Sequence, residues 1–132
     1  MPLARFFFVF VGIIAQKDGV IMKSICDNWE FTECWTDGFA AGEGRGEKVR
    51  IPHTVKEIPL HYADHESYQM ICGYRRKIEF PGKGKRVFVQ FDGAAHIADI
   101  FLNGEKVGES ANMFIAQRFD VTDHLKTGTN VV

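Results

Sequence analysis

Cysteine, net charge and long apolar runs are all scarce in this sequence of 132 residues. The three cysteines, Cys26, Cys34 and Cys72, form no Cys-x-x-Cys pair, which argues against a disulfide framework and a structural zinc site. We expect them to be free, buried thiols in a reducing compartment. The 16 basic and 17 acidic residues nearly cancel, so the chain lacks the basic stripe that binds nucleic acid. No apolar run reaches the roughly 20 residues of a membrane-spanning helix.

The N-terminal segment is the most apolar part of the chain. MPLAR followed by FFFVFVGIIA has the positive start and short apolar core of a signal peptide, but Ile13 stands where a small residue should precede cleavage after Ala15. Alternatively, Met22 is the start and residues 1–21 are an upstream extension. Either interpretation leaves residues 22–132 as the domain. We expect a cytoplasmic protein, or a secreted one if residues 1–15 act as a signal.

After residue 22 the apolar residues recur with a period of two, which predicts short β-strands. Residues 85–93 place three apolar side chains on one face, and residues 96–104 carry apolar groups on both faces, which predicts a central strand. Residues 73–80 also read as a strand, and residues 48–54 as one stopped by Pro52, which lacks a ladder donor. The fold class is therefore all-β, most simply a sandwich.

Turn residues separate these strands. Asn103-Gly104 supplies two residues that tolerate positive φ, as a type I′ hairpin turn requires. Residues 37–47 and 56–72 read as connections, and residues 121–126 could hold one helical turn with Thr122 as its cap. The final TNVV starts like another strand, so we expect a sandwich that is incomplete at its C-terminus, with an open edge.

Candidate metal and catalytic groups are few. His61, Asp64 and His65 have a spacing that a helix uses for zinc, but the segment shows no helical apolar face, so polar loop side chains are the expectation. There is no Gly-x-Ser-x-Gly motif to carry a nucleophile. Glycoside hydrolysis needs two carboxyl groups about 5–9.5 Å apart, and the sequence pairs no two of its acids in this way. We therefore expect no catalytic residue, metal or cofactor.

Exposed aromatic side chains are the remaining candidates for ligand contact. Trp35, Tyr62 and Tyr68 could stack on the apolar face of a sugar, with ordinary packing as the alternative. Trp29, beside Phe31, reads as a core residue.

Six short motifs follow one another in the order NWEF (28–31), RIPHT (50–54), GYRRKIEF (73–80), RVFVQFDG (86–93), FLNGEKVG (101–108) and RFDVTDHLKTGTNV (118–131). This order resembles the N-terminal sugar-binding-type jelly roll, a galactose-binding-domain-like β-sandwich, of glycoside hydrolase family 2. That family includes β-galactosidases, β-glucuronidases and β-mannosidases. The motif residues that we expect to build the fold are Trp29, Pro52, His53, Gly73, Tyr74, Arg75, Asp92, Gly93, Asn103, Gly104, Gly108 and Thr122.

The resemblance implies a parent enzyme that hydrolyses β-linked sugars with retention. In the family an immunoglobulin-like domain and a barrel with two catalytic glutamates follow the jelly roll, and neither is among these residues. The chain alone is therefore expected to be inactive, with carbohydrate and the missing domains as its partners. The rival hypotheses are a free-standing carbohydrate-binding module and a non-carbohydrate interaction domain that docks through its open edge strand.

The resemblance also names one ligand-contacting residue. In some β-galactosidases the acid of a Phe-Asp motif contacts galactose hydroxyls and a sodium ion, and Asp120 of RFD occupies that position here. Capping of residues 122–125 is the alternative role for Asp120. One departure puts the nearby loop shape in doubt: residues 112–114 read Asn-Met-Phe where family members commonly have Gly-Gly-Tyr.

Overall fold

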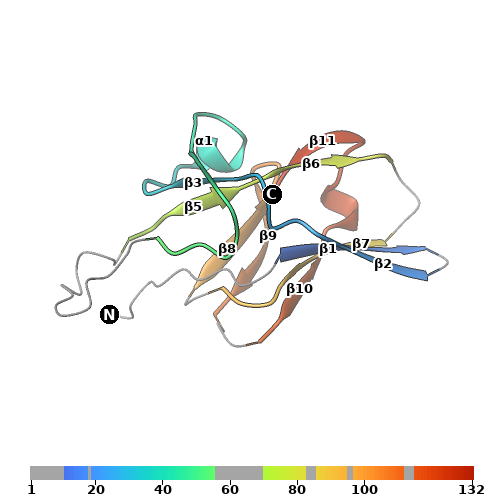
Figure 1. The fold of residues 1–132 in the computed structure, drawn as a ribbon. Helices are drawn as coiled ribbons and strands as arrows, with labels where there is room; N and C mark the ends of the chain where they lie inside the picture. Colours follow the sequence, from blue (N-terminus) through green and yellow to red (C-terminus); the bar gives the residue numbers. More distant parts are fainter. Residues whose placement is uncertain (1–10, 18, 56–69, 83–85, 95–96, 112–114) are drawn as a thin grey trace.

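The computed structural model describes residues 11–17, 19–55, 70–82, 86–94, 97–111 and 115–132. Short antiparallel strands dominate this part of the chain, which confirms the all-β prediction (Figure 1). The elements are β1 Val11–Lys17, β2 Gly19–Ser24, β3 Trp29–Thr32, α1 Asp37–Ala40, β4 Glu47–Val49, β5 Gly73–Arg75, β6 Lys77–Phe80, β7 Arg86–Phe91, β8 Ala98–Leu102, β9 Glu105–Ser110, β10 Gln117–Asp120, the 3-10 turn η2 Thr122–His124, and β11 Gly128–Val131.

The strands form four antiparallel groups. One sheet has the order β10-β7-β1-β2, a second has the order β4-β3-β5, and two pairs consist of β11-β6 and β8-β9. In Figure 1, β3, β5 and β6 run along one side of the molecule, and β1, β2 and β7 lie along another. The arrangement is that of an all-β sandwich.

Strand β7 behaves as its sequence predicts. Val87, Val89 and Phe91 are buried, while Phe88 and Gln90 on the opposite face are half-buried. The strand is hydrogen-bonded to β1 on one edge and β10 on the other. Paired on both edges and buried on one face, β7 is an interior strand of its sheet, as is β1.

Strand β8 does not occupy the central position predicted for it. Among the described residues it pairs only with β9. Its apolar residues on two faces have a different reason: Ile100 and Leu102 are buried in the core, whereas the ring of Phe101 contacts Trp35 in a pocket beside the strand. Apolar residues on both faces of β8 therefore reflect one face in the core and one face in the pocket, not a strand with a neighbour on each edge.

Strand β1 and the first half of β2 lie in residues 1–21, the segment that the sequence analysis sets apart from the domain. Strand β1 pairs with β2 and with β7, so the boundary expected at residue 22 falls inside β2. The chain has an Asp-Gly pair at 18–19, a hairpin signal that the apolar character of residues 1–21 obscures.

The segment GYRRKIEF forms two strands rather than one. Strand β5 pairs with β3, and β6 pairs with β11, so the chain changes sheets at Arg76. The backbone N–H of Arg76 donates to the carbonyl of Val132 at 2.8 Å, and the N–H of Val132 donates back at 3.0 Å. The buried positions change phase at this point, from Gly73 and Arg75 in β5 to Ile78 in β6. The sequence hides the change because residues 75–77 are three consecutive basic residues, which show no apolar alternation.

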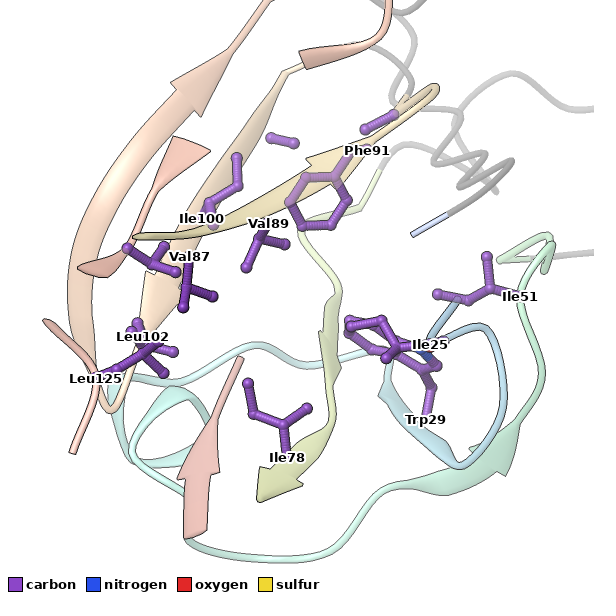
Figure 2. Packing of buried hydrophobic residues seen from close by; sticks show 13 residues of the cluster. Ile25, Trp29, Ile51, Ile78, Val87, Val89, Phe91, Ile100, Leu102 and Leu125 are labelled. Atoms are coloured by element: carbon purple, nitrogen blue, oxygen red, sulfur yellow. The ribbon is translucent and has the colours of Figure 1, made fainter. Parts of the chain in front are cut away.

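The hydrophobic core lies between these strand groups (Figure 2). In that view Val87, Val89, Leu102 and Leu125 gather on one side, and Ile25, Trp29 and Ile51 gather on the other. Trp29 is buried, as predicted, and its indole N–H donates to the carbonyl of Ile25.

Candidate functional site

The described part of the structure holds a pocket of about 500 Å³ beside strands β5 and β8. Its walls are mainly apolar and include Trp35, Phe39, Ile71 and Phe101. Buried core residues, among them Trp29, form its floor. The volume lies within the range of small-molecule sites, which combine apolar walls with a few polar groups.

Helix α1 supplies part of the pocket wall. The sequence predicts only a connection over residues 37–47, but Thr36 caps a four-residue helix: its Oγ1 accepts the N–H of Phe39 at 3.1 Å. The cap turns Phe39 and Ala40 inward, where both are buried. A threonine followed by an acid, Asp37, in the first turn is the signal that predicts such a start.

Arg75 holds this wall to β5. Its guanidinium is 4% exposed, and Nε donates to Glu30 Oε2 at 2.6 Å. The other nitrogens donate to the carbonyls of Phe39, Glu43 and Gly44, and the group lies 4.2 Å from the Phe39 ring centre. A planar donor fork suits this simultaneous contact with a carboxylate and several carbonyls. The sequence assigns Arg75 to the fold, and the structure shows how it acts.

Trp35 lies in the pocket rather than on an open loop surface. It is half-buried, with its ring centre 5.4 Å from that of Phe101 at an angle of 38°. Gly73, also named from its motif, lies beneath these rings, where an added Cβ would come within 2.9 Å of Trp35 and 3.1 Å of Phe39. Phe101 and Asp99 complete the wall, and the sequence analysis singles out neither.

A second aromatic cluster borders the pocket. The hydroxyl of Tyr74 lies 2.8 Å from Nδ1 of His53, and the rings of both residues contact Phe31 at about 5 Å. Burial raises the pKa of Tyr74 and raises the pKa of the Cys72 thiol to about 12. At neutral pH both groups therefore keep their protons, and neither is activated as a nucleophile.

Asp120 lies on the exposed side of β10, outside the residues that line the pocket. Its Oδ1 accepts the N–H of Thr122 at 3.1 Å and the Thr122 hydroxyl at 2.6 Å, and Oδ2 lies 3.0 Å from Arg86. These bonds, those from Thr122 first, lower the pKa of Asp120. Asp120 thus binds the first residue of the turn η2, close to the capping role given as its alternative, although the N-cap residue of η2 is Val121, which makes no side-chain cap hydrogen bond. Thr122 is not the cap predicted for it: it is the first residue of the turn, and its hydroxyl accepts the N–H of Val87. Contact of Asp120 with a ligand stays a prediction.

The hairpin at Asn103-Gly104 forms as predicted. Both residues have positive φ, 52° and 84°, and they connect β8 to β9. The turn is also bonded to β11: the N–H of Asn103 donates to the Val131 carbonyl at 2.7 Å, and its Oδ1 accepts the Val131 N–H at 3.0 Å. Gly108, further along β9, lies against Phe119, whose ring an added Cβ would overlap.

The other predicted residues are distributed as follows. Asp92 accepts a hydrogen bond from Gln90 at 2.7 Å, Gly93 is buried, and Pro52 is exposed after a cis peptide bond. None of the three cysteines forms a disulfide: Cys72 is buried as expected, whereas Cys26 is half-buried and Cys34 is exposed, so the expectation of three buried thiols is wrong for these two. His61, Tyr62, Asp64, His65, Tyr68 and residues 112–114 lie outside the described residues.

Within the described residues, no group of three or more histidine, cysteine or acidic side chains is arranged to hold a metal ion. None of the helices in those ranges is long and apolar enough to cross a membrane. Among the residues that line the pocket, Asp99 is the one acid.

Comparisons with known proteins bear on the whole chain. A family model described as a glycosyl hydrolase 2 galactose-binding domain-like domain matches residues 56–132, more than half of the sequence. A β-galactosidase of Thermoanaerobacter pseudethanolicus is 36% identical over 92 residues, which cover 68% of this chain and 12% of that protein. A β-glucuronidase of Bacteroides fragilis is 28% identical over 131 residues, which cover 96% of this chain and 18% of that protein.

Solved structures give the same result for the fold. The β-glucuronidase of Bacteroides uniformis superimposes with a TM-score of 0.65 at 25% identity, covering 83% of this chain and 14% of that one. The chain therefore spans less than a fifth of the length of these relatives.

Proposed function

Because the chain belongs to the glycosyl hydrolase 2 family, as a galactose-binding domain-like domain of that family, we propose that it serves as the non-catalytic N-terminal domain of a retaining β-glycosidase. In this role it supports a catalytic barrel, and hydrolysis of β-linked sugars is the activity of the whole enzyme. The observation that carries the proposal is the partial match: the chain corresponds to 12% of its β-galactosidase relative.

The chemistry of the pocket supports a non-catalytic role. Retaining hydrolysis requires two carboxyl groups about 5–5.5 Å apart, and Asp99 is the one acid among the lining residues. Asp99 is itself paired with Lys106 at 2.8 Å. Cys72, the thiol in the wall, stays protonated because its pKa is about 12. The described residues of the pocket wall therefore do not supply the pair of carboxyl groups that a retaining glycosidase uses.

The test is an activity assay with two arms. The purified chain is incubated with nitrophenyl β-galactoside, β-glucuronide and β-mannoside, and no turnover is expected. In the second arm, the chain replaces the matching segment of the T. pseudethanolicus β-galactosidase, with deletion of that segment as the control. We expect activity in the chimera and none in the deletion. Turnover by the chain alone would refute the proposal, as would a deletion as active as its parent.

Sugar binding by the isolated domain is a second candidate function, favoured by Trp35 in the pocket wall. A ring of this kind can stack on the apolar face of a pyranose. A sugar that binds only the folded state stabilises it by about 2.7 kcal/mol at a hundredfold excess over Kd, which raises the melting temperature. The matched variants are Trp35→Ala, which should abolish the shift, and Phe88→Ala on the other sheet, which should keep it. An unchanged melting temperature of the parent chain with every sugar tested would exclude this function.

We also propose a cytoplasmic location. The cysteines form no disulfide in the described structure, and an exposed thiol such as Cys34 persists best in a reducing compartment. Fractionation of cells that express the chain, with labelling of Cys34, tests this. Recovery of the chain outside the cell would contradict it.

A further inference from the structure

The hairpin tip carries a reactive dipeptide. Asn103-Gly104 is the one Asn-Gly pair in the sequence, and Gly104 is exposed. In such a pair the backbone nitrogen of the glycine can attack the side-chain carbonyl carbon of the asparagine, because glycine has no Cβ to hinder the approach. The consequence in this molecule depends on what holds the Asn103 side chain.

The Asn103 amide is bonded at both of its polar atoms. Nδ2 donates to Asn130 Oδ1 at 2.9 Å and to the His124 carbonyl at 3.3 Å. Oδ1 accepts the backbone N–H of Val131 at 3.0 Å. Since a backbone N–H can only donate, Oδ1 must face Val131, and Nδ2 must therefore face Asn130.

The partner amide is equally constrained. Asn130 is fully buried. Its Nδ2 donates to the carbonyls of Lys126 at 2.7 Å and Gly128 at 3.0 Å, and its Oδ1 accepts the Lys126 N–H at 3.0 Å. A flip of this amide would set its oxygen against two carbonyls and its nitrogen against an N–H. The Asn130 oxygen that faces Asn103 can therefore only accept a hydrogen bond.

We propose that Asn103-Gly104 is a spontaneous deamidation site that the contact with Asn130 protects in the folded chain, and that modification makes opening of this junction irreversible. The nitrogen that must leave is the one that donates to Asn130 and His124. Attack also requires Cγ to turn toward its own following peptide, so these bonds must break first. Opening of the junction between the hairpin and β11 must therefore precede deamidation.

The chemical step uses only the chain and water. The Gly104 nitrogen loses its proton to solvent base and forms a bond to Cγ of Asn103. Nδ2 takes up a proton from solvent, the bond from Cγ to Nδ2 breaks, and the nitrogen leaves as ammonia. Water then adds to either carbonyl of the resulting five-membered imide, and the ring opens to aspartate or isoaspartate. No oxidant or reductant takes part.

The product does not fit the native junction. An aspartate at position 103 offers only acceptor oxygens at neutral pH. One oxygen could still accept the Val131 N–H, but the other would face Asn130 Oδ1 and the His124 carbonyl, both acceptors. Position 103 is half-buried, and even a partly buried acceptor without a donor is costly, a charged one more so. The isoaspartate form also lengthens the backbone within a two-residue turn.

The first experiment compares modification rates. The chain is incubated at mildly alkaline pH in native buffer, in a series of sub-denaturing urea concentrations, and fully unfolded; peptides are then assayed by mass spectrometry for aspartate and isoaspartate at position 103. We expect at least about tenfold slower modification in the native chain, which corresponds to a local opening free energy of about 1.4 kcal/mol. Asn28, exposed and followed by Trp29, is the internal reference. Equal rates of modification at Asn103 in the native and the unfolded chain would contradict protection by the folded junction.

Variants test the two halves of the proposal separately. Asn130→Ala removes the acceptor and should speed modification of Asn103 in native buffer, and the urea series gives the same information if that variant does not fold. Asn103→Asp, the product itself, should raise the unfolding equilibrium constant at least about tenfold, whereas Asn28→Asp should leave it unchanged. An Asn103→Asp chain as stable as its parent would overturn the irreversible step.

Discussion

Two parts of the interior are built from similar residues but are closed to different degrees. Around β7 and β8, Val89 and Leu102 are each 1% exposed, whereas Ile71 at the rim of the pocket is 76% exposed. Strand β7 has a partner on both edges, while β5 and β8 each have one among the described residues. Leu102 on the singly paired β8 is nevertheless as buried as Val89, while Asp99 and Phe101 on the opposite face of β8 are not buried. The difference teaches that the face on which a side chain lies, rather than its hydrophobicity or the number of partner strands, decides how completely it is buried in this domain.

The largest effect should follow from emptying the closed part. Leu102→Ala should lower the free energy of unfolding by about 2–5 kcal/mol, because the well-packed site cannot collapse around the void. Ile97→Ala at the pocket rim is the matched control and should change it by less than about 0.5 kcal/mol. Urea unfolding measures both. Similar losses in the two variants would mean that the pocket is as closed as the core.

The second-largest effect should follow from replacing Arg75, whose hydrogen bonds hold helix α1 and the loop after it to β5. Arg75→Met removes the donor from the Glu30 carboxylate and from the carbonyls of Glu43 and Gly44, while the Phe39 carbonyl still accepts the N–H of Gly42. The change should cost about 3 kcal/mol, the lower end for a broken buried pair, because Glu30 is 24% exposed. Arg50→Met breaks an exposed pair with Asp27 and should cost at most about 1 kcal/mol. Thermal unfolding of the two variants distinguishes a structural clamp from a surface ion pair.

Added side-chain volume should change the stability of the chain in opposite directions in the two parts. Ala98 is a buried core residue that also lines the pocket, so the methyl groups added in Ala98→Val have free volume beside them. The change should be neutral or stabilising, by at most about 0.8 kcal/mol per buried methylene. Val89→Ile adds one methylene to the closed part and should destabilise the chain by about 1–3 kcal/mol. Denaturation midpoints give both signs. Destabilisation by Ala98→Val would show that the pocket has no room for the added groups.

The smallest effect is electrostatic and lies on the surface. The pKa of Asp120 is lowered in the folded chain, so its contribution to stability is present above the unfolded pKa of about 4 and is lost as the pH falls below it. The side chain is 38% exposed, which keeps the contribution below about 1 kcal/mol. Asp120→Asn should therefore flatten the acid limb of a stability profile and leave the two interior parts unaffected. An unchanged acid limb would assign this pH dependence to other carboxyl groups.

Local patterns predicted the elements well where one face is buried and the turn chemistry is specific. The alternation in residues 86–91 and the Asn103-Gly104 turn are both present as expected. The candidate site was less predictable. Trp35 was identified, but Phe101 and the wall-holding contacts of Arg75 were not, because these side chains meet across segments far apart in the sequence.

The sequence by itself determined the β class, the position of the main hairpin and the family resemblance, since each depends on residue types at short, regular spacing. Only the tertiary structure decided which strand is central, where the chain changes sheets at Arg76, and that β1 and β2 belong to a sheet. It also decided that the hairpin amide meets Asn130. The physical reason is that strand partners and buried polar contacts are long-range, so no local period encodes them.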